Sequence, residues 1–275
     1  MASLTIFANF FIDTLERLHR MKDSYQSFCG ISPNEWVVNI RGRFAADASL
    51  YLQESIQDRL YLFEYDSPEG WFHDSRRMLS HISGGITLFW LEDHLNLAPL
   101  AVLKNCILEM ESENIDIMMY SFWWDGALRD RYRSIQLNTG HYIDWFTLTV
   151  FENNLIQMDN AEGVFIIPAC SLFKSQLFKD IVLTDDPVPP RWPVKTPFDF
   201  EKAPHDIHWL PLRVGLPKQE LFSSIDDDHV HPGSCLISRG IYPKREERSS
   251  YAIFSNNTNL SPISFIYKIV AKLKR

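Results

Sequence analysis

The sequence predicts an α/β fold in which a largely parallel sheet carries helices on both faces. Over residues 3–124, apolar stretches typical of strands alternate with stretches whose apolar residues recur at helical spacing. The composition agrees, because 275 residues suit one large domain or two small ones, and 45% hydrophobic and 13% aromatic content is ample for a folded core. In open sheets of this kind, ligands gather at the carboxyl ends of the strands.

The elements of this half follow one another in a regular order. The expected strands are residues 3–11, 35–42, 59–65, 84–93 and 115–124. The expected helices are residues 13–28, 45–57, 71–82 and 97–114. The first helix is supported by the helical spacing of Leu15, Leu18, Met21 and Tyr25. Strands separated by helices of about this length predict parallel pairing.

The second half of the chain has a different character. Apolar segments at 142–155 and 162–183 are followed by a proline-rich section with seven prolines at 187–211. Prolines at this density cannot lie inside helices or central strands, so we expect a long ordered loop. Such a loop suits the acceptor side of an enzyme or a lid, and a packed structural arm is an equal alternative. We expect one domain over residues 1–260, with halves 1–125 and 126–260.

The charge and the cysteines limit the class of protein. The net charge of −8 argues against a general nucleic-acid binder. The four cysteines lie far apart without a CxxC pair, which favours reduced thiols in a cytoplasmic compartment over disulfides or a zinc site. The N-terminal apolar run has no basic region before it, so no signal peptide is predicted. No segment approaches the roughly 20 apolar residues of a membrane span.

Residues 261–275 differ electrostatically from the rest of the chain. They contain four basic residues and no acidic ones, and on a helical wheel their apolar and basic side chains fall on opposite sides. A basic amphipathic helix can lie on an anionic membrane, which would make the protein peripheral on the inner face of the membrane. A terminal helix packed on the domain fits the pattern equally well.

An acidic pair ends the fourth expected strand. Glu92 and Asp93 follow the apolar run ITLFWL, at the carboxyl end of a strand that we expect near the centre of the sheet. At the frayed end of a strand, both carboxylates can turn toward one hard cation, and that cation can neutralise a diphosphate. Alternatively, Glu92 caps the next helix and Asp93 is solvated.

A second cluster of metal-binding residue types lies at 224–234, SIDDDHVHPGS. Three successive aspartates, 226–228, precede His229 and His231, and the cluster ends at a Pro-Gly turn. On an extended segment, His229 and His231 share a face, which lets two imidazoles approach one metal. The alternative is an acidic, solvated surface turn.

Three features together resemble the nucleotide-sugar-binding half of GT-A-type glycosyltransferases of the family 2 kind. They are the alternating first half, the segment HDSRRML before an apolar strand, and the acidic pair that ends this strand. The resemblance covers residues 1–125 and implies that Glu92 and Asp93 stand for the DxD-like motif, which binds Mn²⁺ or Mg²⁺ and the donor diphosphate. The sequence LEDH departs from DxD, so the share of each acid is open. The resemblance also implies that His229 or His231 completes the metal shell.

The same resemblance implies a site for the nucleotide-sugar donor. Asn9, near the end of the first strand, would contact the nucleotide base. Asn39 and Arg41 would lie at the end of the second strand, where an arginine can pair with phosphate bidentately. Asp74 and Arg76 would hold the nucleoside or the donor sugar. Structural roles are the alternative, with Asp74 at a helix N-terminus and Arg76 facing solvent.

We therefore expect a metal-dependent glycosyltransferase that moves a sugar from a nucleotide-sugar donor to a glycan or lipid-linked acceptor, with surface polysaccharide synthesis as one setting. If the reaction inverts configuration, a carboxylate would deprotonate the acceptor hydroxyl, with Asp199, Glu201 and Asp227 as candidates. A metal-dependent phosphoesterase or a non-catalytic nucleotide-sugar-binding protein are the alternatives. The sequence contains no P-loop, GxGxxG, GxSxG or HExxH motif, which disfavours those classes.

Overall fold

The computed structural model describes residues 3–121, 135–159, 167–184, 200, 209–227 and 233–244. The strands are β1 (Leu4–Phe11), β2 (Glu35–Arg41), β3 (Leu60–Phe63), β4 (Ile86–Phe89), β5 (His94–Asn96), β6 (Ile117–Met119), β7 (Asn138–Thr139), β8 (Ile143–Leu148), β9 (Ser171–Lys174), β10 (Leu212–Pro217) and β11 (Phe222–Ser224). The helices are α1 (Leu15–Phe28), α2 (Ala45–Ser55), α3 (Trp71–Met78), α4 (Leu100–Ser112), α6 (Val150–Asp159) and α7 (Ser175–Leu183), with short 3-10 turns η1 (Cys29–Ile31) and η2 (Leu79–His81).

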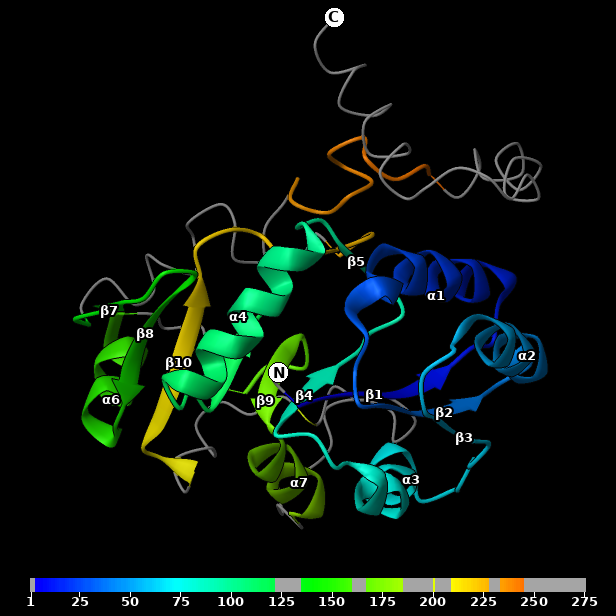
Figure 1. The fold of residues 1–275 in the computed structure, drawn as a ribbon, viewed down its shortest axis with the longest axis horizontal. Helices are drawn as coiled ribbons and strands as arrows, with labels where there is room; N and C mark the ends of the chain where they lie inside the picture. Colours follow the sequence, from blue (N-terminus) through cyan, green and yellow to red (C-terminus); the bar gives the residue numbers. More distant parts are fainter. Residues whose placement is uncertain are drawn as a thin grey trace, which may run out of the picture.

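Within these residues, nine strands form one sheet in the order β3-β2-β1-β4-β9-β6-β10-β8-β7. The strands β1, β2, β3 and β4 pair in parallel, as the sequence predicted. The helices α1 and α2 lie above this part of the sheet and α3 and α7 lie below it, as Figure 1 shows. The predicted class, a mostly parallel α/β sheet with helices on both faces, is confirmed.

The second half of the sheet contains antiparallel strands that the sequence pattern did not predict. The strand β9 is inserted between β4 and β6 and is antiparallel to both. Beyond β6, β10 continues in parallel, and β8 and β7 close the sheet with antiparallel pairs. The four residues of β9 run directly into α7, and so short an apolar strand cannot be told from the first turn of a helix by periodicity.

Two hydrophobic clusters, one on each face of the sheet, form the core. Alternate residues of a strand point to opposite faces, so Ile6, Ala8 and Phe10 pack with α1, α2 and α4, whereas Phe7 packs with α3 and α7. Aromatic rings are numerous in both clusters: Trp36 and Trp90 meet on the first face, and rings of α3, α7 and the strands meet on the second. The sheet is therefore rigidly held between two layers of helices.

A buried carboxylate fastens the amino-terminal edge of the sheet. Glu35, at the start of β2, accepts hydrogen bonds from the amides of Ser83 and Gly84 at 3.0 and 3.1 Å and from Ser83 Oγ at 2.5 Å. The hydroxyl of Thr5 donates to the same carboxylate. These bonds tie β1, β2 and the loop before β4 together, at the end of the sheet opposite the predicted site.

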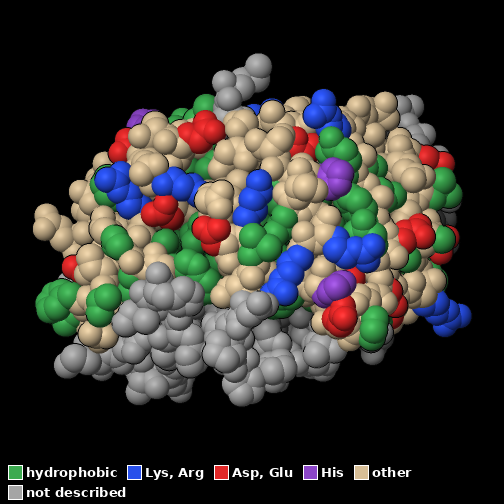
Figure 2. All heavy atoms as spheres, turned by 90° about the horizontal axis from the view of Figure 1, so that it is seen from below, with side chains coloured by type: hydrophobic (Ala, Val, Ile, Leu, Met, Phe, Trp, Pro, Cys, Tyr) green, Lys and Arg blue, Asp and Glu red, His purple; other side chains and the backbone are tan. Residues whose placement is uncertain are grey.

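The sequence also led to predictions about the C-terminal tail, the domain limits and membrane spans. Residues 261–275 and all of the proline-rich section except Phe200 and residues 209–211 lie outside the described residues, so the predicted tail helix and the domain limits stay predictions. None of the helices in the described part of the chain is long and apolar enough to cross a membrane. The face seen in Figure 2 carries basic and acidic side chains close to one another.

Candidate functional site

The acidic pair lies in a turn, residues 91–94, that we call the acidic turn. The strand β4 ends at Phe89, so the predicted strand 84–93 is shorter than expected. The Trp90 amide still donates to the carbonyl of Phe7 at 2.8 Å, which keeps the chain beside β1 for one more residue. Glu92 and Asp93 then occupy the turn into β5. The two carboxylates are therefore beyond the carboxyl edge of the parallel strands, where the sequence placed the site.

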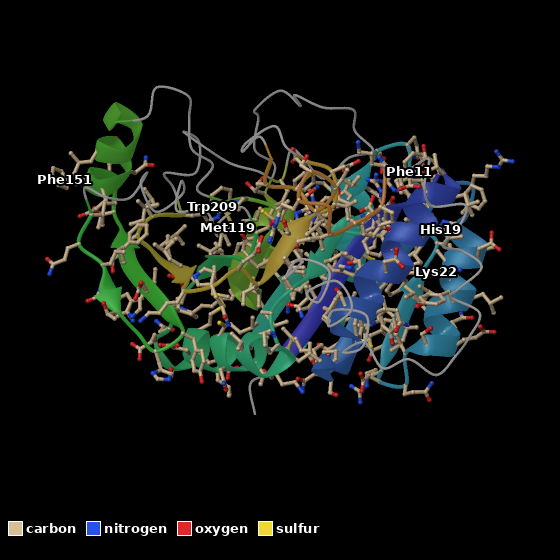
Figure 3. The ribbon with its side chains drawn as sticks, turned by 90° about the horizontal axis from the view of Figure 1, so that it is seen from above. Phe11, His19, Lys22, Met119, Phe151 and Trp209 are labelled. Atoms are coloured by element: carbon tan, nitrogen blue, oxygen red, sulfur yellow. The ribbon has the colours of Figure 1, made fainter. Side chains whose placement is uncertain are left out.

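The helix α1 supports the acidic turn from one side. Ser24 Oγ is buried, donates a hydrogen bond to the carbonyl of His94 at 2.5 Å and accepts one from Trp90 Nε1 at 2.8 Å. Arg17, Arg20 and Ser24 are spaced i, i+3 and i+7, so they share one face of the helix. We call these three residues the α1 face. Figure 3 shows Phe11 where β1 approaches α1, with His19 and Lys22 further along the helix.

The charges in the acidic turn are unequal. Burial, together with the neighbouring charge of Asp93, raises the pKa of Glu92 to about 7. Arg17 Nη1 lies 3.7 Å from Glu92 Oε1 and opposes this effect. Burial would also raise the pKa of Asp93, but His94, whose Nδ1 lies 2.7 Å from Asp93 Oδ1, holds that pKa below its ordinary value. At neutral pH, Asp93 is therefore the ionised member of the pair and Glu92 titrates.

The start of the second predicted cluster lies beside the acidic turn. The strand β11 pairs antiparallel with β5, with Ser224 opposite His94. The amide of Ile225 then donates to the carbonyl of Asp93 at 2.8 Å. Asp226 Oδ2 lies 2.7 Å from Arg20 Nη2, and the amide of Asp227 donates to Ser224 Oγ at 3.0 Å. The structure thus brings Asp227 and the acidic turn together, although the sequence separates them by more than 130 positions.

The residues of this region suit a hard divalent cation. Carboxylate oxygens are the donors that Mg²⁺ and Mn²⁺ prefer, and the acidic turn carries two adjacent carboxylates, Glu92 and Asp93. Within the described residues, no three His, Cys, Asp or Glu side chains gather closely enough to hold a metal. His229 and His231, which the sequence suggested as further ligands, lie outside the described residues.

A second polar group lies on the opposite face of β1 and β2. Asn39 Nδ2 donates to Asn9 Oδ1 at 2.9 Å and to the carbonyl of Tyr65 at 2.9 Å. Asn9 Nδ2 donates to Ser75 Oγ and to the carbonyl of Trp71, both on α3. Both asparagines are buried, and they fix α3 and the loop after β3 to the sheet. Contact with a nucleotide base stays a prediction for both.

Arg41 and Asp74 belong to the same group and interact electrostatically. The guanidinium of Arg41 is buried, with Nη1 4.0 Å from Asp66 Oδ1. Burial lowers the pKa of Arg41, and the charges of Asp74 and Asp66 oppose that change. Asp74 accepts hydrogen bonds from the Ser67 amide, and burial raises its pKa. These two predicted site residues are therefore brought together at the carboxyl end of β2.

The loop after β2 requires a glycine. Gly42 has φ +101°, and a Cβ there would lie 2.7 Å from the carbonyl oxygen of Ile12. That oxygen accepts a hydrogen bond from the Phe44 amide, and the Ile12 amide donates to the carbonyl of Arg41. The ends of β1 and β2 are therefore locked together directly behind Arg41.

The remaining predicted residues are separated from this edge or lie outside the described residues. Arg76 donates to the carbonyls of Val182 and Thr184 at 3.0 and 2.8 Å, so its guanidinium binds the C-terminal end of α7. A contact with the donor stays a prediction for Arg76. Asp199 and Glu201, the other candidates for the base, lie outside the described residues.

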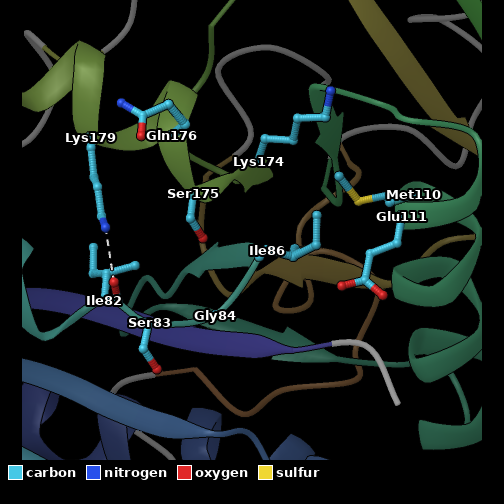
Figure 4. A pocket seen from close by; sticks show the side chains of 11 residues that line it. Ile82, Ser83, Gly84, Ile86, Met110, Glu111, Lys174, Ser175, Gln176 and Lys179 are labelled. Atoms are coloured by element: carbon cyan, nitrogen blue, oxygen red, sulfur yellow. Dashed lines mark hydrogen bonds between the residues drawn. The ribbon is translucent and has the colours of Figure 1, made fainter.

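A cavity of about 390 Å³ opens at the opposite, amino-terminal edge of the sheet. Figure 4 shows it between Ile86 and Met110 on one side and α7 on the other. Its lysines have protein partners: Lys174 Nζ lies 2.7 Å from Asp116 Oδ1, and Lys179 Nζ donates to the carbonyl of Ile82 at 2.9 Å. Because its cations have protein partners and it lies away from the carboxyl ends of the strands, we do not assign the site to it.

Sequence reasoning missed the α1 face. The signal was present, because Arg17, Arg20 and Ser24 recur at helical spacing within the correctly predicted first helix. The pattern could not reveal which elements this face would meet, since Asp226 reaches it only through the pairing of β5 with β11.

No known family model and no curated protein sequence matches the chain. Among solved structures, it is similar to residues 1–349 of TarS from S. aureus, at 12% identity and TM-score 0.50, covering 81% of this chain and 60% of that chain. The same fragment in complex with UDP-GlcNAc gives 11% identity, TM-score 0.48 and coverages of 85% and 61%. Glucosyl-3-phosphoglycerate synthase from Mycobacterium tuberculosis, in complex with Mn²⁺, UDP-glucose and phosphoglyceric acid, gives 15% identity and a TM-score of 0.40. This match covers 64% of this chain and 57% of that chain. The chain thus spans less than two thirds of the length of these neighbours, and its fold is GT-A-like.

Proposed function

We propose that the protein is a glycosyltransferase that takes its sugar from a nucleotide-sugar donor. The observation that carries this proposal is the pairing of β5 with β11, which joins two segments predicted independently from their residue types: the acidic turn and the segment that begins at Asp226. They meet beyond the carboxyl ends of parallel strands, where open α/β sheets bind ligands. The GT-A-like fold supports the same proposal, since TarS, which shares it, has been crystallised with UDP-GlcNAc.

In this proposal, one group of polar residues binds the nucleoside part of the donor, and the acidic turn binds its diphosphate part. The group around Asn39, Arg41 and Asp74 fixes the ends of β1 and β2 and the loop after β3, the surface proposed for the nucleoside. The acidic turn would face the diphosphate. Arg17, whose side chain is 45% exposed, adds a positive charge there; its guanidinium contacts the carbonyl of Phe11 and the carboxylate of Glu92, and a phosphate oxygen would join these partners.

The proposed reaction requires stabilisation of the negative charge on the departing nucleoside diphosphate. We assign Asp93 as the principal ligand for Mg²⁺ or Mn²⁺, with Glu92 beside it, because the Asp93 side chain is 34% exposed against 19% for Glu92 and is the more accessible carboxylate of the pair. A divalent cation, when bound, supplies charge that stabilises the departing nucleoside diphosphate. Asp227 is the described candidate for the base that takes the proton of the acceptor hydroxyl, since its segment lies next to the acidic turn.

A thermal-shift screen tests the proposal. We expect a UDP-sugar at about 100 times its Kd, with Mn²⁺, to raise the melting temperature by about 5–10 °C, from about 2.7 kcal/mol of binding energy. Asp93→Asn should abolish the shift, and Glu92→Gln should reduce it. The exposed Asp180→Asn variant on α7 is the matched control and should respond like wild type.

Two results would contradict the proposal. One is a native protein whose melting temperature no nucleoside diphosphate or nucleotide sugar changes, with or without Mn²⁺. The other is an Asp93→Asn variant that binds the donor as tightly as wild type does. Rapid release of phosphate from a phosphoester, without any acceptor, would instead indicate a phosphoesterase.

A further inference from the structure

Arg20 is the charged contact between α1 and the segment 222–227. Its guanidinium bridges two carboxylates, with Nε 3.0 Å from Glu16 Oε1 and Nη2 2.7 Å from Asp226 Oδ2. The side chain of Arg20 is only 11% exposed, and that of Glu16 is 12% exposed. The Asp226 side chain is 46% exposed, but the arginine is already held in place by its own helix before it meets Asp226, which lowers the entropy cost of the pair.

The contact lies one residue from the bond that joins the two halves of the site. The amide of Ile225 donates to the carbonyl of Asp93, and Asp226 follows immediately. On the helix, Ser24 lies one turn beyond Arg20 and holds the acidic turn through the carbonyl of His94. The α1 face therefore contacts both segments: Ser24 bonds to the acidic turn, and Arg20 pairs with Asp226 of the segment 222–227.

The apolar contacts below support the same docking without determining where Asp226 lies. Ile225 packs in a small cluster with Leu236 and Tyr242, against Leu95 and Leu97 of the β5 region. Tyr242 Oη also donates to Asp23 Oδ2 on α1 at 2.6 Å. Hydrophobic contacts are not directional. Backbone hydrogen bonds hold Ser224 and Ile225 in place, and the ion pair with Arg20 holds the next residue, Asp226, against α1.

We propose that Arg20 is a positioning residue that, through Asp226, docks the segment 222–227 against the acidic turn and so presents Asp227 to the cation and the donor. The proposal rests on the proposed function for its purpose, but the docking itself is a property of the protein alone. The pairing also engages Asp226 Oδ2, which would otherwise be a further carboxylate oxygen near the acidic turn. Substituting Arg20 should loosen the segment and release a competing carboxylate.

Hydrogen–deuterium exchange on the full chain tests the docking directly. Arg20→Gln and Asp226→Asn should each raise the exchange rate of the Ile225 amide by about tenfold, as expected when a partly buried, charge-assisted hydrogen bond is lost. The double variant should be no worse than either single one, because both remove the same interaction. Lys22→Gln, on the same helix with its Nζ over the Tyr51 ring, is the control and should leave the Ile225 amide unchanged.

Mn²⁺ binding, followed by the electron paramagnetic resonance signal of free Mn²⁺, gives the second readout. We expect Arg20→Gln to change the Mn²⁺ affinity several-fold and Lys22→Gln to leave it unaltered. Unchanged exchange at Ile225, additive effects in the double variant, or exchange that rises equally throughout the chain would each overturn the proposal. If wild type binds neither Mn²⁺ nor a nucleotide, the proposed function fails, while the exchange measurements still decide whether Arg20 docks the segment.

Discussion

Removing the hydroxyl of Ser24 should destabilise the protein far more than an ordinary serine substitution. Ser24→Ala deletes a buried donor to the carbonyl of His94 and a buried acceptor for Trp90 Nε1. Each group left unsatisfied in the interior costs about 1–3 kcal/mol. The gain in helix propensity of alanine over serine offsets about 0.5 kcal/mol. We therefore expect a net loss of about 1.5–5.5 kcal/mol in the free energy of unfolding.

Urea and thermal unfolding, followed by tryptophan fluorescence, measure this loss. A loss of this size should lower the melting temperature by at least about 3 °C and by up to about 20 °C. Ser80→Ala, an exposed substitution after α3, is the control and should change stability by less than about 0.5 kcal/mol. If Ser24→Ala costs no more than Ser80→Ala, Ser24 does not hold the acidic turn and the role of the α1 face is wrong.

Three further substitutions test the edges of the sheet by urea unfolding. Burial raises the Glu35 pKa, but hydrogen bonds from Ser83, Thr5 and Gly84 outweigh it and hold the pKa below its ordinary value of 4.5. Its stabilisation is thus present above that value and lost as pH falls through the folded pKa, so Glu35→Gln should cost about 1–2 kcal/mol at pH 7 and progressively less below pH 4.5. Gly42→Ala should cost about 2–3 kcal/mol through strain against Ile12, and a cost below 0.5 kcal/mol would contradict it. Asn39→Ala should cost about 2–4 kcal/mol by stranding the Tyr65 amide, with unchanged stability as the contrary result.

The first half of the fold could be predicted because its signals are local. Each strand and helix of the β1 to β4 region can be recognised from its own residues, by an apolar run or by apolar residues at helical spacing. The acidic turn was located for the same reason, since Glu92 and Asp93 follow an apolar strand directly. The end of β4 was placed too late, because Trp90 and Leu91 continue the apolar run although only the Trp90 amide still bonds to β1.

The rest depended on contacts between distant segments, which periodicity does not encode. Nothing local in the sequence indicates that β9 would enter between β4 and β6, or that β11 would choose β5 as its partner. For the same reason, Arg20 could be placed on a helix but not opposite Asp226. Asn9 and Asn39 were chosen for their position at strand ends, and their hydrogen bonds to each other and to α3 could not be foreseen from spacing alone.

The pairing of β5 with β11 also has a consequence for the order of events during protein synthesis. The smallest separation in that ladder, from Asn96 to Phe222, is 126 positions, the difference of the two numbers. Folding during synthesis begins at the N-terminus. The strands β1 to β4 can therefore pair before β11, the partner of β5, has been made. A nascent chain would therefore carry the paired strands β1 to β4 before β11 has been made, so the acidic turn and the segment 222–227 come together only late in synthesis.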